Sequence, residues 1–230
     1  MPRRWVSSVS EPRAVPFWSP EEVEASLAGT IAHLGVGGII AYPTETVYGF
    51  GGNADQVGVD ALVRLKGRAP GKPFLLLISG SDMIKRLGLR LTQPASALAA
   101  RHWPGPLTLV LPGGEHRVPD RLRGPEGGVA VRWTPHRGLA RLITALGEPI
   151  TSTSANRPGV PPASSAVEIV REWSDAMTRG VLRVLDGGHL QSSLASTVVD
   201  CTGRLPRVIR PGAIPAATLR ESVPDLIGDA

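Results

Sequence analysis

The chain has 230 residues, of which 42% are hydrophobic and 20% are charged, and its formal net charge is +5 at pH 7. This length and apolar content allow one large domain with a substantial core. The single cysteine, Cys201, excludes an internal disulfide and a cysteine-based zinc cluster, and no apolar stretch approaches the ~20 residues that span a bilayer, so we expect a soluble protein of the reducing cytoplasm. The positive charge favours anionic ligands, either nucleotide or nucleic acid.

The first nineteen residues contain several arginines and prolines but no apolar segment of signal-peptide length, so we expect a loosely ordered extension. Its aromatic residues, Trp5, Phe17 and Trp18, are expected to pack on the protein surface, because no alternation of basic and aromatic residues supports an arm that binds nucleic acid. The pattern that begins at Ser19 then predicts a capped helix with proline and acids in its first turn, ending at Gly35.

Residues 37–79 hold the pattern around which the rest of the chain is organised. They predict a buried strand over 39–42, a polar loop over 44–46, a helix capped by Asp55 and a second strand over 74–78. Between helix and strand lies a basic corner with Lys66, Arg68 and Lys72, although lysine is rare in this chain. Lysine is a compact charge and arginine a planar fork, so this corner could meet a phosphate in two geometries; a solvated helix end is the simpler alternative.

The second half of the chain alternates further strands and helices. We expect short helices over 83–89, 93–103, 135–146 and 166–173, and strands over 107–111, 129–133, 181–185, 195–201 and 207–210. Residues 113–127 predict a mobile surface loop in which Arg117, Arg121 and Arg123 are solvated rather than bound to an anion. Residues 149–156 form a hydroxyl-rich segment that leaves a strand, and the tail beyond residue 212 is expected to be peripheral.

Several common chemistries find no support in the sequence. It contains no P-loop, no GxGxxG after a strand and no GxSxG elbow, and its five histidines lack metal-ligand spacing. What remains is a set of cations and hydroxyls, which suits reactions that depend on positioning and charge neutralisation. Phosphoryl and nucleotidyl transfer are reactions of this kind.

Seven segments carry a family resemblance, and they occur in one order between about residues 20 and 212: YPTETVYGFGGNAD, KGRAPGKPF, WPGPLTLVL, VAVRW, PITSTSANRPG, ASTVVD and VIRPGAI. This order resembles the YrdC family, the threonylcarbamoyl-AMP synthases. The resemblance implies an α/β fold with an open, twisted sheet of parallel and antiparallel strands, flanking helices and one deep basic cleft. It also implies a catalytic domain over 20–212, between the extension 1–19 and a tail 213–230, in the short single-domain form.

Members of this family combine L-threonine, bicarbonate and ATP into threonylcarbamoyl-AMP and pyrophosphate, for the threonylcarbamoyl-adenosine of tRNA. On chemical grounds, the threonine amine first captures carbon dioxide or bicarbonate as a carbamate, whose oxygen attacks the α-phosphorus of ATP. Mg²⁺ is expected with the triphosphate. The expected protein partners are downstream threonylcarbamoyl-transferase proteins, with tRNA as an RNA partner.

The resemblance assigns roles to ten residues of this sequence. The basic residues expected around the phosphates are Lys66, Arg68, Lys72 and Arg210, of which Lys66 and Arg68 are expected to be catalytic. Ser154 and Asn156 match the nucleotide side. The threonine side is matched by Thr44, Arg132, Ser152 and Ser196, with Arg132 as the partner of the carboxylate.

Two positions depart from the family pattern, and two other functions stay open. Leu77 stands where many members have a polar residue near threonine, and Gly128 stands where many have threonine, which makes a nucleotide contact there backbone-only. The protein could instead be a non-catalytic module that binds tRNA or ribosomal RNA through the same basic surface. A carbamoyl-adenylate enzyme like the related domain of hydrogenase maturation proteins is a third reading, which the lack of its accompanying segments disfavours.

Overall fold

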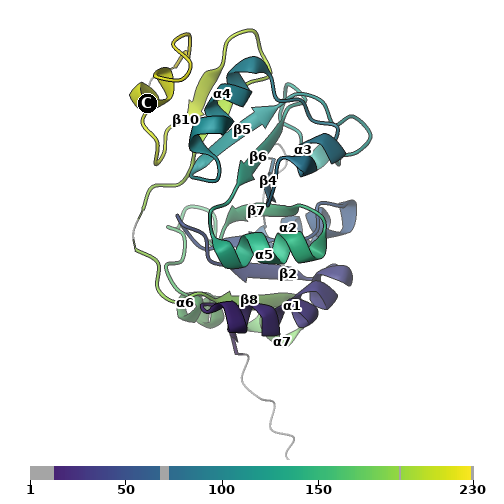
Figure 1. Cartoon of the computed structure of the whole chain (residues 1–230). Helices are drawn as coiled ribbons and strands as arrows, with labels where there is room; N and C mark the ends of the chain where they lie inside the picture. Colours follow the sequence, from purple (N-terminus) through teal and green to yellow (C-terminus); the bar gives the residue numbers. More distant parts are fainter. Residues whose placement is uncertain (1–12, 68–72, 192, 229–230) are drawn as a thin grey trace, which may run out of the picture.

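The computed structural model describes residues 13–67, 73–191 and 193–228. In these ranges the strands form one mixed sheet in the order β1-β8-β2-β3-β7-β4-β6-β5-β9-β10, which confirms the predicted open α/β sheet (Figure 1). Neighbours run parallel at β1/β8, β8/β2, β4/β6 and β5/β9 and antiparallel elsewhere. The strands are β1 (Val15–Pro16), β2 (Ile39–Tyr42), β3 (Gly49–Gly51), β4 (Leu75–Ile78), β5 (Leu107–Leu111), β6 (Val129–Trp133), β7 (Ile150–Ser154), β8 (Leu182–Asp186), β9 (Thr197–Asp200) and β10 (Arg207–Arg210).

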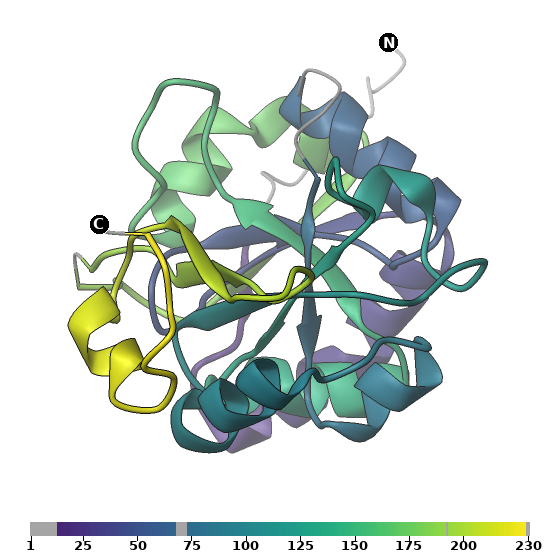
Figure 2. The same ribbon diagram turned by 90° about the horizontal axis from the view of Figure 1, so that it is seen from above.

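The helices lie on both faces of this sheet. They are α1 (Pro20–Gly35), α2 (Gln56–Lys66), α3 (Asp82–Arg86), α4 (Gln93–His102), α5 (Arg137–Leu146), α6 (Ala166–Glu172), α7 (Ser174–Thr178) and α8 (Ala216–Arg220), with a short 3₁₀ turn, η1, at Asp120–Leu122. Figure 2 shows α1, α4 and α5 on one side of the strands and α2 and α6 on the other. None of the helices in the described ranges is long and apolar enough to cross a membrane.

Local signals account for the helix ends. Ser19 and Glu22 form a reciprocal capping box at the start of α1, and the Asp55 carboxylate accepts the Gly58 N–H (2.7 Å) at the start of α2. The helix α2 ends at Gly67, which adopts the left-handed conformation (φ 57°) that glycine permits. These caps fix where α2 delivers Lys66, its last residue.

The segment before residue 20 is not a loose extension where it is described. Val15–Pro16 pairs in parallel with β8, and the Phe17 N–H donates to the Asp186 carbonyl (2.8 Å). The Phe17 side chain is fully buried and stacks on the His136 ring, whereas Trp18 is exposed. Trp5 lies outside the described residues.

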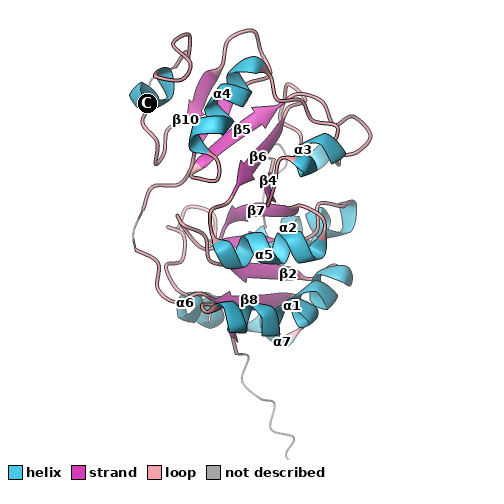
Figure 3. Ribbon diagram, in the orientation of Figure 1, coloured by secondary structure: helices cyan, strands magenta, loops and turns pink. Residues whose placement is uncertain are grey.

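The tail beyond residue 212 also packs on the body, contrary to expectation. Leu219, Val223 and Leu226 are buried in the hydrophobic core. The Val208 N–H donates to the Ile227 carbonyl (2.9 Å), so the tail satisfies hydrogen bonds at the β10 edge. Figure 3 shows the tail beside β10, with α8 as its helical turn.

The loop over 113–127 is anchored to the protein by a few buried residues, although much of it is exposed. Val118 and Leu122 are buried, and the Arg123 guanidinium donates to the carbonyls of Gly113 (3.0 Å), Gly127 (2.8 Å) and Gly114. The expectation of a solvated Arg123 is therefore wrong, because this arginine binds backbone carbonyls of its own loop, whereas Arg117 and Arg121 are exposed as expected.

The central strand β7 runs through the hydroxyl-rich segment itself, and the sequence pattern missed its neighbour β3. The hydroxyl of Thr151 accepts the Gly52 N–H (2.9 Å) and donates to the Gly52 carbonyl (3.1 Å), which ties the two segments together. A Cβ at Gly51 would collide with the Thr151 carbonyl oxygen. The strand β3 therefore needs glycine where a strand pattern would have a side chain.

Candidate functional site

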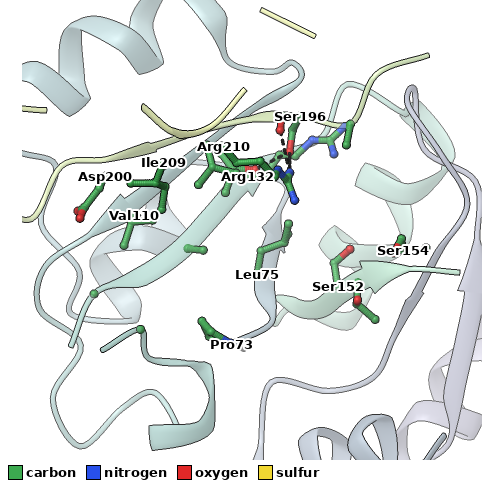
Figure 4. A pocket seen from close by; sticks show the side chains of 18 of the residues that line it. Pro73, Leu75, Val110, Arg132, Ser152, Ser154, Ser196, Asp200, Ile209 and Arg210 are labelled. Carbon is green, nitrogen blue, oxygen red and sulfur yellow. Dashed lines mark hydrogen bonds between the residues drawn. The ribbon is translucent and has the colours of Figure 1, made fainter. Parts of the chain in front are cut away.

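A cavity of about 580 Å³ opens on the sheet face opposite α4 and α5. Along β5, β6 and β9 its lining residues alternate, which places them on one face of the sheet, whereas β7 lines the cavity with the three consecutive residues Ser152, Thr153 and Ser154. They include Leu75 of β4, Thr108 and Val110 of β5, Ala130 and Arg132 of β6, Ser152 and Ser154 of β7, Ser196, Val198 and Asp200 of β9 and its approach, and Arg207, Ile209 and Arg210 of β10. Figure 4 shows Arg132, Ser196 and Arg210 together on one side of this cavity, with Ser152 and Ser154 on a neighbouring part of its wall.

Six of the residues assigned from the sequence line this cavity. They are Thr44, Arg132, Ser152, Ser154, Ser196 and Arg210. Residues from the first third to the last tenth of the chain thus meet at one place, although their roles toward ligands stay predictions. Arg68 and Lys72 lie outside the described residues.

Arg132 is buried at the cavity wall and paired with a carboxylate. Its Nη2 donates to Glu45 Oε1 and to the hydroxyl of Thr46 (3.2 Å). The other oxygen of Glu45 accepts from the Thr134 hydroxyl (3.3 Å). Within the described ranges, the Arg132 Nε is buried and has no hydrogen-bond partner. A buried donor of this kind is costly, and the ion pair with Glu45 offsets part of that cost.

Arg210 lies close enough to Arg132 for their charges to interact. Its Nη2 donates to the Ser196 carbonyl (2.7 Å) and hydroxyl (3.0 Å), and that hydroxyl also bonds the Thr108 hydroxyl (2.8 Å). Burial, and then the neighbouring charge of Arg132, lower the pKa of Arg210. Two guanidinium groups that repel each other in a cavity form a site for an anion.

The cavity lining is not uniformly positive. The described lining includes the acids Glu126 and Asp200 in addition to the basic residues Arg132, Arg207 and Arg210. Asp200 Oδ1 accepts from the Thr202 N–H (2.9 Å) and hydroxyl (2.6 Å), which orders the turn after β9. The deep basic cleft expected from the sequence therefore stays a prediction.

The hydroxyl of Thr44 organises its own loop. It donates to the Val47 carbonyl (2.7 Å) and accepts the N–H groups of Thr46 and Val47 (both 3.1 Å). This small turn follows β2 and presents Thr46 to Arg132. In the structure Thr44 thus shapes the loop. Its expected contact with the substrate L-threonine is still a prediction.

Lys66 is buried at the end of α2, and its ammonium group is held by β7 and the turn after it. Nζ donates to the carbonyls of Ser154 (2.9 Å) and Asn156 and to Asn156 Oδ1 (2.7 Å), and it lies 6.0 Å from the centre of the Phe50 ring. The Ser154 hydroxyl donates to the same Asn156 oxygen (2.7 Å). Lys66 and Asn156 thus set the conformation of Ser154 at the cavity wall.

The two positions that depart from the family pattern have clear structural settings. Leu77 is fully buried and pairs in register with Arg132 on one side and Ile150 on the other. Gly128 lines the cavity, and a Cβ there would come within 2.6 Å of side-chain methyl groups of Val110 and Thr202. These two neighbours fill the space that a threonine side chain would need.

Sequence reasoning missed three residues of this site: Glu45, Thr46 and Thr108. Each holds a residue that was predicted, because Glu45 and Thr46 bind Arg132 and Thr108 binds Ser196. Glu45 and Thr46 lie in the polar loop 44–46, and that position was the available signal. Thr108 gave none, because a single hydroxyl in the strand LTLVL does not stand out.

Comparisons with known proteins find relatives in sequence and in fold. The Sua5/YciO/YrdC family model, described as "Telomere recombination", matches residues 32–212. A threonylcarbamoyl-AMP synthase of Thiobacillus denitrificans is 38% identical over 189 residues, which cover 81% of this chain and 97% of that protein. One of Pyrococcus abyssi is 36% identical over 194 residues, which cover 84% of this chain but 54% of the relative, so the chain spans about half the length of that protein.

A solved structure has the same fold. The crystal structure of P. abyssi Sua5 complexed with L-threonine aligns with a TM-score of 0.82 and 30% sequence identity, covering 94% of this chain and 62% of that one.

Proposed function

The chain belongs to the Sua5/YciO/YrdC family, and we propose that it is a nucleotidyltransferase that forms L-threonylcarbamoyl-adenylate and pyrophosphate from L-threonine, bicarbonate and ATP. The product would serve the threonylcarbamoyl-adenosine modification of tRNA. The observation that carries this proposal is the cavity in which Arg132, Arg210 and a set of hydroxyls converge. The relatives' name and the L-threonine complex of P. abyssi Sua5 support the choice of substrate.

The proposed chemistry joins two anions. The threonine amine captures carbon dioxide or bicarbonate as a carbamate, and a carbamate oxygen attacks the α-phosphorus of ATP as pyrophosphate leaves. Arg132 and Arg210 lie on the same side of the cavity, where their positive charges offset the repulsion between carbamate and phosphate. Two substrates held side by side react as one unit, which lowers the entropic part of the barrier.

The nucleotide side of the proposal rests on Ser154. Lys66 and Asn156 hold this residue, so its hydroxyl, which donates to Asn156, is fixed as an acceptor for a ribose hydroxyl. Within the described residues, Arg210 is the positively charged side chain that would contact the phosphates. We expect Arg68 and Lys72 to contact the phosphates as well.

Mg²⁺ fits this proposal as a companion of ATP. In the part of the chain that the structure describes, no group of three or more histidine, cysteine, aspartate or glutamate residues is arranged to hold a metal ion. Phosphate oxygens and water are therefore its expected main ligands, and Asp200 and Glu126 are the lining carboxylates that could join them. Bound there, Mg²⁺ would neutralise charge on the phosphates.

The deciding experiment measures pyrophosphate release from purified protein with ATP and Mg²⁺, leaving out L-threonine or bicarbonate in turn, with the adenylate identified by mass. Release that needs both co-substrates is the expected result. The hydrogenase-maturation reading would instead require carbamoyl phosphate to replace threonine and bicarbonate. Absence of ATP and threonine binding, together with tRNA binding that weakens steeply with salt, would favour the RNA-binding module.

A further inference from the structure

Hydrogen bonds within the protein already use part of the donor capacity of the Arg132 guanidinium. Nη2 carries two hydrogens, and its two acceptors are Glu45 Oε1 and Thr46 Oγ1. An arginine can bind a carboxylate through two parallel hydrogen bonds in two ways. One way uses Nη2 and Nε and the other uses Nη2 and Nη1, so both need Nη2. A substrate carboxylate therefore meets an arginine whose Nε and Nη1 are its remaining donor groups.

Glu45 binds this arginine but is not among the described residues that line the cavity. The described lining includes its neighbours Thr44 and Thr46 and also Arg132, but not Glu45 itself. Its side chain is 23% exposed, against 6% for Arg132. The Thr134 hydroxyl holds its second oxygen, so both oxygens of the carboxylate are engaged by the protein.

A counter-charge is needed at this position. Arg132 is buried and interacts unfavourably with the charge of Arg210. A buried cation without a partner turns away or becomes disordered, because burial removes its hydration. Glu45 supplies the partner, and through Thr134 it is itself tied to the start of α5, where the His136 N–H donates to the Thr134 hydroxyl (3.2 Å).

We propose that Glu45 is a positioning residue for substrate recognition: it fixes Nη2 of Arg132 against the wall and so leaves Nη1 to donate to the carboxylate of the amino acid substrate. This inference rests on the proposed function. The Arg132 Nε points to the other side of the guanidinium and is buried from solvent, so it takes no part in this contact. The fixed guanidinium then selects ligands with a carboxylate at one defined place.

The test compares Glu45→Gln with wild type, and uses Glu24→Gln as a matched control. Glu24 forms an exposed pair with Arg141 away from the cavity lining, so the control removes the same charge from another Glu–Arg pair. L-threonine and ATP binding are measured separately by calorimetry, and KM and kcat by pyrophosphate release. L-threoninamide, which lacks the carboxylate, serves as a second ligand.

We expect Glu45→Gln to weaken L-threonine binding and raise its KM by about tenfold, the loss of roughly one charge-assisted hydrogen bond, with kcat and ATP affinity nearly unchanged. Its preference for L-threonine over the amide should fall, and Thr134→Val should act in the same direction but less. Unchanged L-threonine affinity in Glu45→Gln would overturn the proposal. Tighter binding would also overturn it, since Glu45 would then be a competitor of the substrate carboxylate.

Two further results have distinct meanings. If L-threonine affinity, ATP affinity and thermal stability all fall together in Glu45→Gln, the residue is structural and the proposal fails. If the wild-type protein itself binds no L-threonine, the proposed function fails, and this is seen before any variant is measured.

Discussion

Replacing Lys66 by methionine tests how the buried ammonium group supports the site. The variant keeps the apolar stem next to Phe50 but removes the donor to three oxygens of Ser154 and Asn156. One hydrogen bond to a charged group contributes about 1.5–3 kcal/mol. The three bonds share one cation whose burial is itself costly, so we expect a net loss of about 3 kcal/mol in the free energy of unfolding rather than their sum.

For a chain of this length, that loss corresponds to a fall in Tm of about 6–12 °C. Calorimetric unfolding measures it, and titration with ATP and Mg²⁺ should show at least about tenfold weaker nucleotide binding because Ser154 is no longer held. Lys85→Met is the control, since Lys85 is exposed on α3. A Lys66→Met protein with the Tm and ATP affinity of the control would refute the reasoning.

Three further predictions address the surrounding fold. Tyr48→Phe removes a hydroxyl that donates to one backbone carbonyl (2.8 Å) and accepts one N–H (3.0 Å), so urea unfolding should show a loss of about 1–3 kcal/mol, and an unchanged midpoint would contradict this link. Leu219→Ala should lower the free energy of unfolding by about 2–5 kcal/mol because the side chain is fully buried. The same change at the half-exposed Leu205 should lower it far less. Equal losses in the two variants would show that the tail does not contribute to the core. Burial lowers the pKa of His136 below 6.5, so the unfolded chain binds more protons there and stability falls as the pH drops below that value. His136→Asn keeps an acceptor for the start of α5 but cannot titrate, so its free energy of unfolding should decline less between about pH 6.5 and 5, and parallel curves would argue against a role for this histidine.

Local chemistry made much of the fold predictable. The caps at Ser19 and Asp55, the apolar runs of β2 and β6 and the prolines before β5 are signals that act within a few residues. The apolar runs placed β4, β5, β6, β9 and β10 to within two residues of their observed ends, whereas β7 was expected only as a segment that leaves a strand. The same signals failed at β3, where close contact with β7 requires glycine, and no local pattern reports such contact.

The site was predictable where a residue type suggested an anion partner, and not where the partner was another part of the chain. Arg132 stood out at the end of an apolar strand, but Glu45 lies 87 residues away and its pairing depends on the strand order. The assignment of Lys66 to phosphates stays a prediction; its described partners, Ser154 at the end of β7 and Asn156 after it, lie 88 and 90 residues further on. Long-range pairs of this kind are decided by topology, which a single sequence constrains only loosely.

The strand order also matters while the chain is being synthesised. The loop that carries Thr44 is made early, but Ser196 and Arg210 come from the approach to β9 and from β10, which leave the ribosome after the other strands of the cavity wall. A nascent chain therefore exposes the strands of the cavity wall before it can close the cavity. A ligand stabilises only the form that binds it, so substrates that occupy the whole cavity cannot stabilise an unfinished chain. The exposed strands must therefore be protected from aggregation by other means until β10 pairs with β9.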